Sequence, residues 1–165
     1  MPRAIGACVS NRACEPRRTS CVFCAIVDGQ LPAQVIHEDE HFVVLLDIFP
    51  LRPSHVLIVA RGHAPFLADL PAAPREALLA LADRVGRALY RSDPAVLGIN
   101  LLINDGPVAN QHVPHLHLYL TPRRVGDLPA LCWRTLTRFL PLGRKRIEAR
   151  LAGEAERLRA ALAEG

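Results

Sequence analysis

Hydrophobic and polar positions alternate over short runs in much of this chain. Residues 34–39 (QVIHED) and 41–48 (HFVVLLDI) are rich in Val, Ile and Leu and meet at an acidic turn, which predicts a β-hairpin. Similar runs predict a third strand at residues 55–60 (HVLIVA), a fourth at 97–105 (LGINLLIND) and a fifth at 115–122 (HLHLYLTP). The pattern therefore predicts a sheet built from short strands.

After Pro74 the hydrophobic period changes to three and four residues, which predicts one long helix beginning near that proline. A short helix is expected within residues 128–141, and a longer one over 143–163. The apolar stripe of the longer helix consists of Ile147, Leu151, Ala155, Leu158 and Leu162. The order of elements predicts an α+β domain, in which an antiparallel five-stranded meander packs on one main helix and a C-terminal helical extension follows.

Three segments are expected along the chain. Residues 1–19 are basic and unpatterned and are predicted to form a flexible leader. Residues 20–124 hold the predicted domain, and residues 125–165 hold the helical extension. The stripe on the extension has two possible partners, its own domain or an interface with a second copy of the chain.

Composition narrows the classes of function. Lys and Arg total 20 against 16 Asp and Glu, and much of the basic excess lies near the two ends, so anionic partners are favoured over a dedicated nucleic-acid surface. The sequence has no apolar run long enough to span a membrane and no pattern of a secretory signal. We therefore expect a soluble cytoplasmic protein. Five cysteines fit reduced thiols or a metal site, and Cys132 is expected to be buried.

The fifth predicted strand carries the most unusual pattern. His115, His117 and Tyr119 face one side of a strand, and the three leucines at 116, 118 and 120 face the other. Imidazole is a nucleophile and proton carrier near neutral pH once a hydrogen bond fixes its tautomer. A polar, solvent-facing strand is the alternative interpretation. The loop just upstream favours a catalytic role for this strand, because it contains residues that can surround an anion with N–H donors: Asn104, Asp105, Gly106 and Gln111.

These residues carry a resemblance to a known family. The segment NDGPVANQHVPHLHLYLTPR resembles the signature of the histidine triad (HIT) family, and residues 21–63 resemble that family's N-terminal half, including its Cys-x-x-Cys and its "LDI…P…P-x-H" stretch. The resemblance covers residues 21–124 and departs at Tyr119, which replaces the third histidine. It implies an HIT-like fold and a nucleotide hydrolase or transferase that cleaves a phosphorus–heteroatom bond through a covalent nucleotidyl-histidine.

The resemblance also implies catalytic roles. His117 corresponds to the nucleophile, and His115 to the residue whose backbone carbonyl orients it. His55 corresponds to a histidine packed beside the nucleophile. Tyr119 can donate a hydrogen bond but exchanges a proton poorly at neutral pH. We hypothesise that His112, in the preceding loop, supplies the missing imidazole.

A nucleotide site follows from the same resemblance. Asp47 corresponds to the carboxylate that accepts the two ribose hydroxyls, while Asn104 and Gln111 lie where the family binds phosphate. The implied apolar slot for a purine base consists of Val22, Phe23, Ile26, Leu45 and Ile48. Alternatively, Asp47 is a turn carboxylate and the five apolar residues are ordinary core. The implied substrate is a purine nucleotide or a dinucleotide.

Cys21, Cys24, His63 and His115 correspond to a structural zinc set in several relatives, and Cys₂His₂ suits tetrahedral Zn²⁺. Two reduced thiols under the sheet are the alternative. No organic cofactor is implied, and the resemblance predicts a homodimer. Two rival functions stay open: a nucleotide-binding protein that has lost hydrolysis and acts through partners, and a metal-binding regulator built on the two cysteines.

Overall fold

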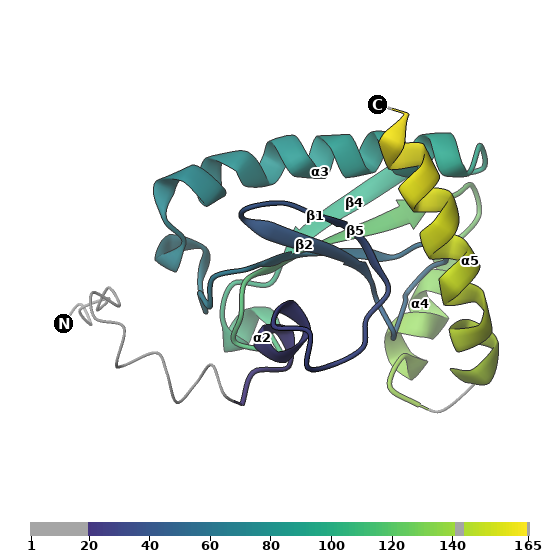
Figure 1. Cartoon of the computed structure of the whole chain (residues 1–165). Helices are drawn as coiled ribbons and strands as arrows, with labels where there is room; N and C mark the ends of the chain where they lie inside the picture. Colours follow the sequence, from purple (N-terminus) through teal and green to yellow (C-terminus); the bar gives the residue numbers. More distant parts are fainter. Residues whose placement is uncertain (1–19, 141–143, 165) are drawn as a thin grey trace.

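An antiparallel five-stranded sheet, with a long helix across one face, organises the chain (Figure 1). The computed structural model describes residues 20–140 and 144–164, so the predicted leader at 1–19 lies outside the described residues. The strands stand in the order β1-β2-β3-β5-β4. Their bounds are β1 (Val35–Glu38), β2 (Phe42–Leu46), β3 (Val56–Ala60), β4 (Gly98–Ile103) and β5 (His117–Arg123).

The predicted α+β class and antiparallel sheet are confirmed, but the strand order departs from a simple meander. β5 lies between β3 and β4, with Leu57 and Leu102 opposite Tyr119 on the two sides. The long helix α3 (Ala72–Ser92) separates β3 from β4 in sequence, so the chain returns at the sheet edge and β5 fills the gap. The strand with the histidines is therefore paired on both sides.

The leucines of the fifth strand pack toward α3, as predicted. Leu116, Leu118 and Leu120 join one buried cluster with residues of α3 that include Leu81 and Val85. The helix begins at Ala72, so the prediction of a start near Pro74 was slightly wrong. Proline is tolerated there because the first N–H groups of a helix have no intrahelical partner.

The opposite face of the sheet is covered by a short helix that the hydrophobic pattern did not predict, α2 (Val22–Val27). Its Phe23 packs with alternate residues of the central strands, among them Val43, Leu57 and Val59. Two single-turn 3₁₀ helices complete the loops, at Leu67–Asp69 and Pro107–Ala109. His117 and Tyr119 belong to the face covered by α2.

The C-terminal extension forms α4 (Leu128–Thr137) and α5 (Arg144–Ala163). Leu151, Ala155, Leu158 and Leu162 of the predicted stripe are buried in the main core, where α5 contacts α3 and β1. The stripe therefore packs on its own domain. Cys132, expected to be buried, is exposed on α4. Among the described residues, no helix combines the length and hydropathy needed to cross a bilayer.

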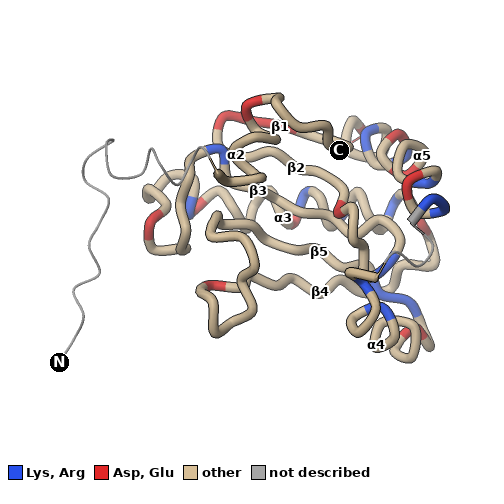
Figure 2. Tube along the Cα trace, turned by 90° about the horizontal axis from the view of Figure 1, so that it is seen from below, with Lys and Arg blue, Asp and Glu red and all other residues tan. Residues whose placement is uncertain are grey.

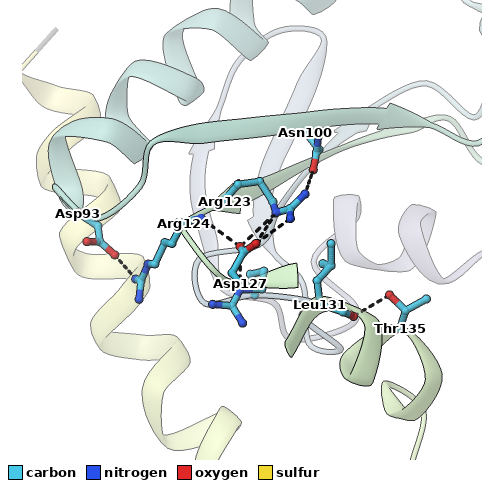
Figure 3. A network of polar contacts seen from close by, with 8 residues as sticks. Asp93, Asn100, Arg123, Arg124, Asp127, Leu131 and Thr135 are labelled. Atoms are coloured by element: carbon cyan, nitrogen blue, oxygen red, sulfur yellow. Dashed lines mark hydrogen bonds and ion pairs between the residues drawn. The ribbon is translucent and has the colours of Figure 1, made fainter. Parts of the chain in front are cut away.

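A buried carboxylate anchors the start of α4 (Figure 3). Asp127 accepts three contacts of 2.7–3.2 Å from the guanidinium of Arg123, which in turn donates to Asn100 of β4. The hydrogen bonds from Arg123 are the main cause that lowers the pKa of Asp127 to about 2. Arg52, from the loop after β2, approaches the same carboxylate at 3.4 Å. The extension is thus tied to β4, to β5 and to the β2–β3 loop.

Candidate active site

His117 is held in one tautomer by its own strand. Its Nδ1 lies 2.7 Å from the carbonyl oxygen of His115, which can only accept, so Nδ1 carries the proton. Nε2 is left with a lone pair. Burial lowers the pKa of His117, against opposing effects of the His115 carbonyl and of Asp47, so the ring is neutral near pH 7. A neutral imidazole with an available Nε2 lone pair is the nucleophilic form.

Tyr119 is the partner of that lone pair. Its hydroxyl lies 2.9 Å from Nε2 of His117 and donates to it, because Nε2 has no proton. Burial, followed by the charge of Asp47, raises the pKa of the phenol, so it stays protonated at neutral pH. The ring also stacks on His55, at a centroid distance of 5.3 Å. Tyr119 thus covers Nε2 of His117 with a hydrogen-bond donor.

Asp47, just after β2, is buried, and its carboxylate contacts two side chains. Its Oδ2 lies 3.1 Å from Nδ1 of His55 and 2.9 Å from Nη2 of Arg138. Burial alone raises the pKa of this carboxyl, but the hydrogen bond and charge of His55, then Arg138 and the Phe49 N–H, outweigh it. The pKa of Asp47 is therefore lowered, and the carboxylate is charged.

A cavity of about 500 Å³ borders these groups and holds several of the predicted site residues. His55, Asn104, His112 and Tyr119 line it, while His117 does not. The Asn104 amide donates to the carbonyl of Asn110 at 3.2 Å. Asn110 has φ of 66°, a left-handed conformation that Asn tolerates better than most residues other than glycine.

The Gln111 side chain holds this loop through two hydrogen bonds. Its side-chain oxygen accepts from the N–H of Gly106 at 3.0 Å, and its amide donates to the carbonyl of Pro65 at 2.7 Å. The side chain therefore ties the loop together, and it is not among the residues that line the cavity. His112 is exposed at the cavity wall, with its ring edge toward Phe139 at 5.6 Å.

The five residues of the predicted base slot are only partly brought together. Phe23 and Leu45 are buried in the cluster under α2, with Ile26 packed beside them. The Phe23 ring lies 4.9 Å from that of His117. Val22 and Ile48 are exposed, with 41% and 54% of their surface accessible. Three of the five residues thus pack together near His117, and the two exposed ones do not join them.

The predicted metal ligands converge from three parts of the chain. Cys21, Cys24, His63 and His115 place one ligand atom each within 4.8 Å of one another. Four of these separations are 3.3–3.5 Å. Tetrahedral Zn²⁺ with bonds of about 2.0–2.3 Å needs ligand atoms about 3.3–3.8 Å apart, so the set is close to the required geometry.

The imidazole of His115 is oriented for such a role. Its Nε2 donates to the carbonyl of Ala60 at 2.7 Å, so the lone pair of Nδ1 points to the two sulfur atoms and to His63. A backbone acceptor on the second nitrogen is the usual way in which proteins fix a metal-binding histidine. The donor set and its orientation therefore fit zinc.

Sequence reasoning missed the contribution of α4. Arg138 and Phe139 line the cavity, and the Arg138 guanidinium lies 5.1 Å from the centre of the Phe139 ring. Arg138 stands 91 positions from its partner Asp47, and no local pattern links them. One signal was available: Arg134 and Arg138 are four residues apart in an otherwise apolar segment, which predicts a basic helix face.

The extension also holds the loop that carries Asp47 and His55. Arg134 of α4 donates to the carbonyl of Pro50, at 3.2 Å from Nη2. Buried Glu154 of α5 accepts from the N–H of Ser54 at 2.8 Å. Ser54 has φ of 59°, a costly conformation for serine, so the buried carboxylate stabilises a strained turn.

Together these features define a class of protein: a small α+β domain that presents a tautomer-fixed histidine, a carboxylate and an amide-bearing loop beside a cavity. The particular family follows from comparison. The HIT domain model matches residues 28–126, and the chain belongs to this family.

Individual relatives agree with this assignment. A HIT-like protein of Mycobacterium tuberculosis is 38% identical over 107 residues, which are 65% of this chain and 74% of that protein. The adenylylsulfatase HINT3 of Arabidopsis thaliana is 31% identical over 110 residues, 67% of this chain and 55% of that protein. A zinc-bound histidine triad family protein from Mycobacterium smegmatis superposes with a TM-score of 0.73 at 38% identity, covering 89% of this chain and 96% of the other.

The pairing of Asp47 with Arg138 predicts a pH-dependent loss of stability in Arg138→Met. At pH 7 the variant leaves a buried carboxylate with one partner fewer, so its free energy of unfolding falls by about 1–3 kcal/mol. A carboxyl with a lowered pKa stabilises the fold above its unfolded pKa, near 3.8, and this contribution is lost as the pH falls below that value. The difference between variant and parent therefore narrows below about pH 4.

Urea denaturation between pH 7 and pH 3 measures this difference. Arg87→Met is the matched control, because Arg87 pairs with Asp83 on the surface, with both side chains more than half exposed. That variant loses less than about 0.5 kcal/mol at pH 7. Equal losses in the two variants would contradict a special role for the buried pair.

Proposed function

We propose that this protein is a nucleotide hydrolase or transferase that cleaves a phosphorus–heteroatom bond through a nucleotidyl-His117 intermediate. The observation that carries the proposal is the hydrogen bond from Nδ1 of His117 to the His115 carbonyl, which leaves the Nε2 lone pair for attack on phosphorus. Membership of the HIT family, and the adenylylsulfatase named among the relatives, agree with this class of reaction.

In the first step, Nε2 of His117 bonds to the α-phosphorus and the bond from phosphorus to the leaving group breaks. The leaving group departs with the electron pair of that bond and takes a proton from His112. Water then attacks the same phosphorus and gives a proton back to His112, while the P–N bond breaks and its electron pair returns to Nε2 as a lone pair. Because Tyr119 donates to Nε2 in the described structure, the phenol must turn away before attack. It is then placed to donate to the phosphate or to the leaving group, in place of the family's third histidine.

The surrounding residues take supporting roles in this proposal. Asp47 accepts the ribose hydroxyls, for which Arg138 must release or share the carboxylate. Asn104 and the loop around Gln111 contact the phosphate. Phe23 and its apolar neighbours stack on a purine base. His112 supplies an imidazole at the cavity wall, where it can protonate the leaving group.

One observation favours a second candidate, a nucleotide-binding protein with weakened catalysis. The reactive nitrogen is occupied by Tyr119, and the ribose-binding carboxylate by Arg138. Both contacts oppose the reaction unless the substrate replaces Tyr119 at His117 and Arg138 at Asp47 when it binds. Turnover measurements therefore decide between the two candidates.

His117→Ala is expected to abolish turnover of adenosine phosphoramidate and of dinucleoside polyphosphates, since it removes the nucleophile. His112→Ala lowers turnover by about 10²-fold, the range for loss of a general acid. Mass spectrometry of the parent protein after rapid acid quench reveals a nucleotide attached to His117. His37→Ala, on β1, is the control and keeps full activity.

Full turnover in His112→Ala would eliminate the role of that residue while leaving His117 in place. Saturable nucleotide binding with no turnover in the parent protein would establish the second candidate.

We also propose that Cys21, Cys24, His63 and His115 hold a structural zinc ion. Zinc held there would tie Cys21 and Cys24, at and within the start of α2, to His115, two residues before His117, and the zinc-bound structure of the Mycobacterium smegmatis relative agrees with this role. Elemental analysis is expected to find about one zinc per chain in the parent and in Cys132→Ser, whose thiol is exposed, and none in Cys24→Ser. Chelation lowers the unfolding midpoint by roughly 5 °C or more, about 2 kcal/mol at this size. Equal zinc in both serine variants would contradict the assignment.

We further propose a two-fold dimer through α3 and β4. β4 is an edge strand of the described sheet, and Leu79 and Tyr90 of α3 and Leu101 of β4 are exposed beside it. Pairing two such edges would cover apolar surface and continue the sheet. Light scattering is expected to give a dimer for the parent and for Leu136→Lys, and a monomer for Leu101→Lys. A monomeric parent at micromolar concentration would rule out the dimer.

A further inference from the structure

A second cavity, of about 370 Å³, lies between the β2–β3 loop, α4 and α5. It shares only Leu51 with the cavity beside His117. Its charged lining comes from distant parts of the sequence, and Figure 2 shows Lys and Arg gathered where α4 and α5 approach each other. The arginines of the lining are Arg52, Arg134, Arg146 and Arg150.

The lining is strongly positive, because Glu154 is its only acidic residue. Both oxygens of Glu154 are already engaged: Oε1 accepts from Arg150 at 2.8 Å, and Oε2 accepts from the Ser54 N–H at 2.8 Å. This carboxylate therefore neutralises at most one of the four guanidinium groups.

Several of the guanidinium donors are not used in these contacts. Arg134 uses Nε and Nη2 on the Pro50 carbonyl, and Arg150 uses Nε and Nη2 on Glu154, so Nη1 of each takes part in neither contact. Arg146 forms no ion pair with any residue in the described ranges, although it lines the cavity. Arg52 pairs with Asp127 and Arg150 with Glu154, so Arg134 and Arg146 are the lining arginines without a carboxylate partner among the described residues. Like charges held close together repel one another, and a bound anion relieves that repulsion.

We propose that this cavity binds a small, multiply charged phosphate anion, of the di- or triphosphate class. Guanidinium groups match phosphate oxygens with pairs of N–H donors, and charge-assisted hydrogen bonds of this kind are the strong ones. The volume suits a small molecule, and Pro50, Pro53 and Ile147 give the lining an apolar part. The site is separate from the nucleophile and does not depend on the proposed reaction.

Isothermal titration with inorganic triphosphate tests the site at constant ionic strength. One saturable event per chain is expected, weakening as salt is added. Arg146→Ala is expected to weaken binding by about tenfold, and Arg146→Glu more, because each removes a guanidinium donor of the lining. Arg157→Ala is the matched control: Arg157 is exposed on the same helix but does not line the cavity, so the affinity changes less than about twofold.

Further variants and ligands show where the anion binds and which of its chemical groups the cavity recognises. His117→Ala and Arg138→Met keep the affinity for triphosphate, because neither residue lines this cavity. The part of nucleoside triphosphate binding that persists in Arg138→Met weakens in Arg146→Ala to the same extent as binding of inorganic triphosphate, and the bare nucleoside shows no binding that depends on Arg146. Circular dichroism checks that each variant keeps the parent's fold.

The proposal is overturned by any of three results: no saturable binding of triphosphate, equal losses in Arg146→Ala and Arg157→Ala, or a loss that follows Arg138 instead of Arg146. Equal losses would mean attraction by surface charge alone. A loss that follows Arg138 would place the anion in the cavity beside His117.

Discussion

The hydrogen bond between His117 Nδ1 and the His115 carbonyl is the constraint on which the site depends. It joins residues two apart on one strand, so it needs no distant partner and forms as soon as the strand is extended. The same His115 directs its imidazole into the Cys₂His₂ cluster through its bond to Ala60. One residue therefore fixes the tautomer of the neighbouring histidine and contributes to the cluster that anchors the N-terminal helix. The two contacts use different parts of His115: its backbone carbonyl holds His117, and its imidazole belongs to the Cys₂His₂ cluster.

Around this strand, the C-terminal extension completes the site. Asp127 ties the start of α4 to β5 and β4, and Arg134, Arg138 and Glu154 then contact the β2–β3 loop from two helices. Buried ionic contacts of this kind are weak sources of net stability but fix geometry, because an unpaired charge in the same place would be costly. The loop with Asp47 and His55 is thus positioned by segments that lie outside the matched HIT domain.

Tyr119, which we expected in place of a third histidine, makes a contact that the sequence alone did not indicate. It lies on the predicted face of β5, and its hydroxyl bonds directly to Nε2 of His117. The phenol stays protonated because burial and Asp47 raise its pKa. In the proposed reaction, the Tyr119 hydroxyl gives up its hydrogen bond to His117 and forms one to the substrate.

Local periodicity determined much of this protein. Alternation in residues 115–120 placed the leucines toward the helix and His117 and Tyr119 on the other face. The stripe on α5 correctly predicted four buried residues, and its fifth member, Ile147, is partly buried. These predictions are correct because the directions of side chains on a strand or a helix depend on positions close in sequence. The burial of Cys132 was predicted wrongly, because its apolar neighbours do not reveal which side of α4 meets solvent. Only the tertiary structure decided that β5 is central, that Arg138 meets Asp47, and that four scattered arginines line one cavity. The β3–β5 pairs join residues 58–64 positions apart, and the contacts between the extension and the β2–β3 loop join residues 84–100 apart. At such separations the packing of whole elements, and no local pattern, sets the distance.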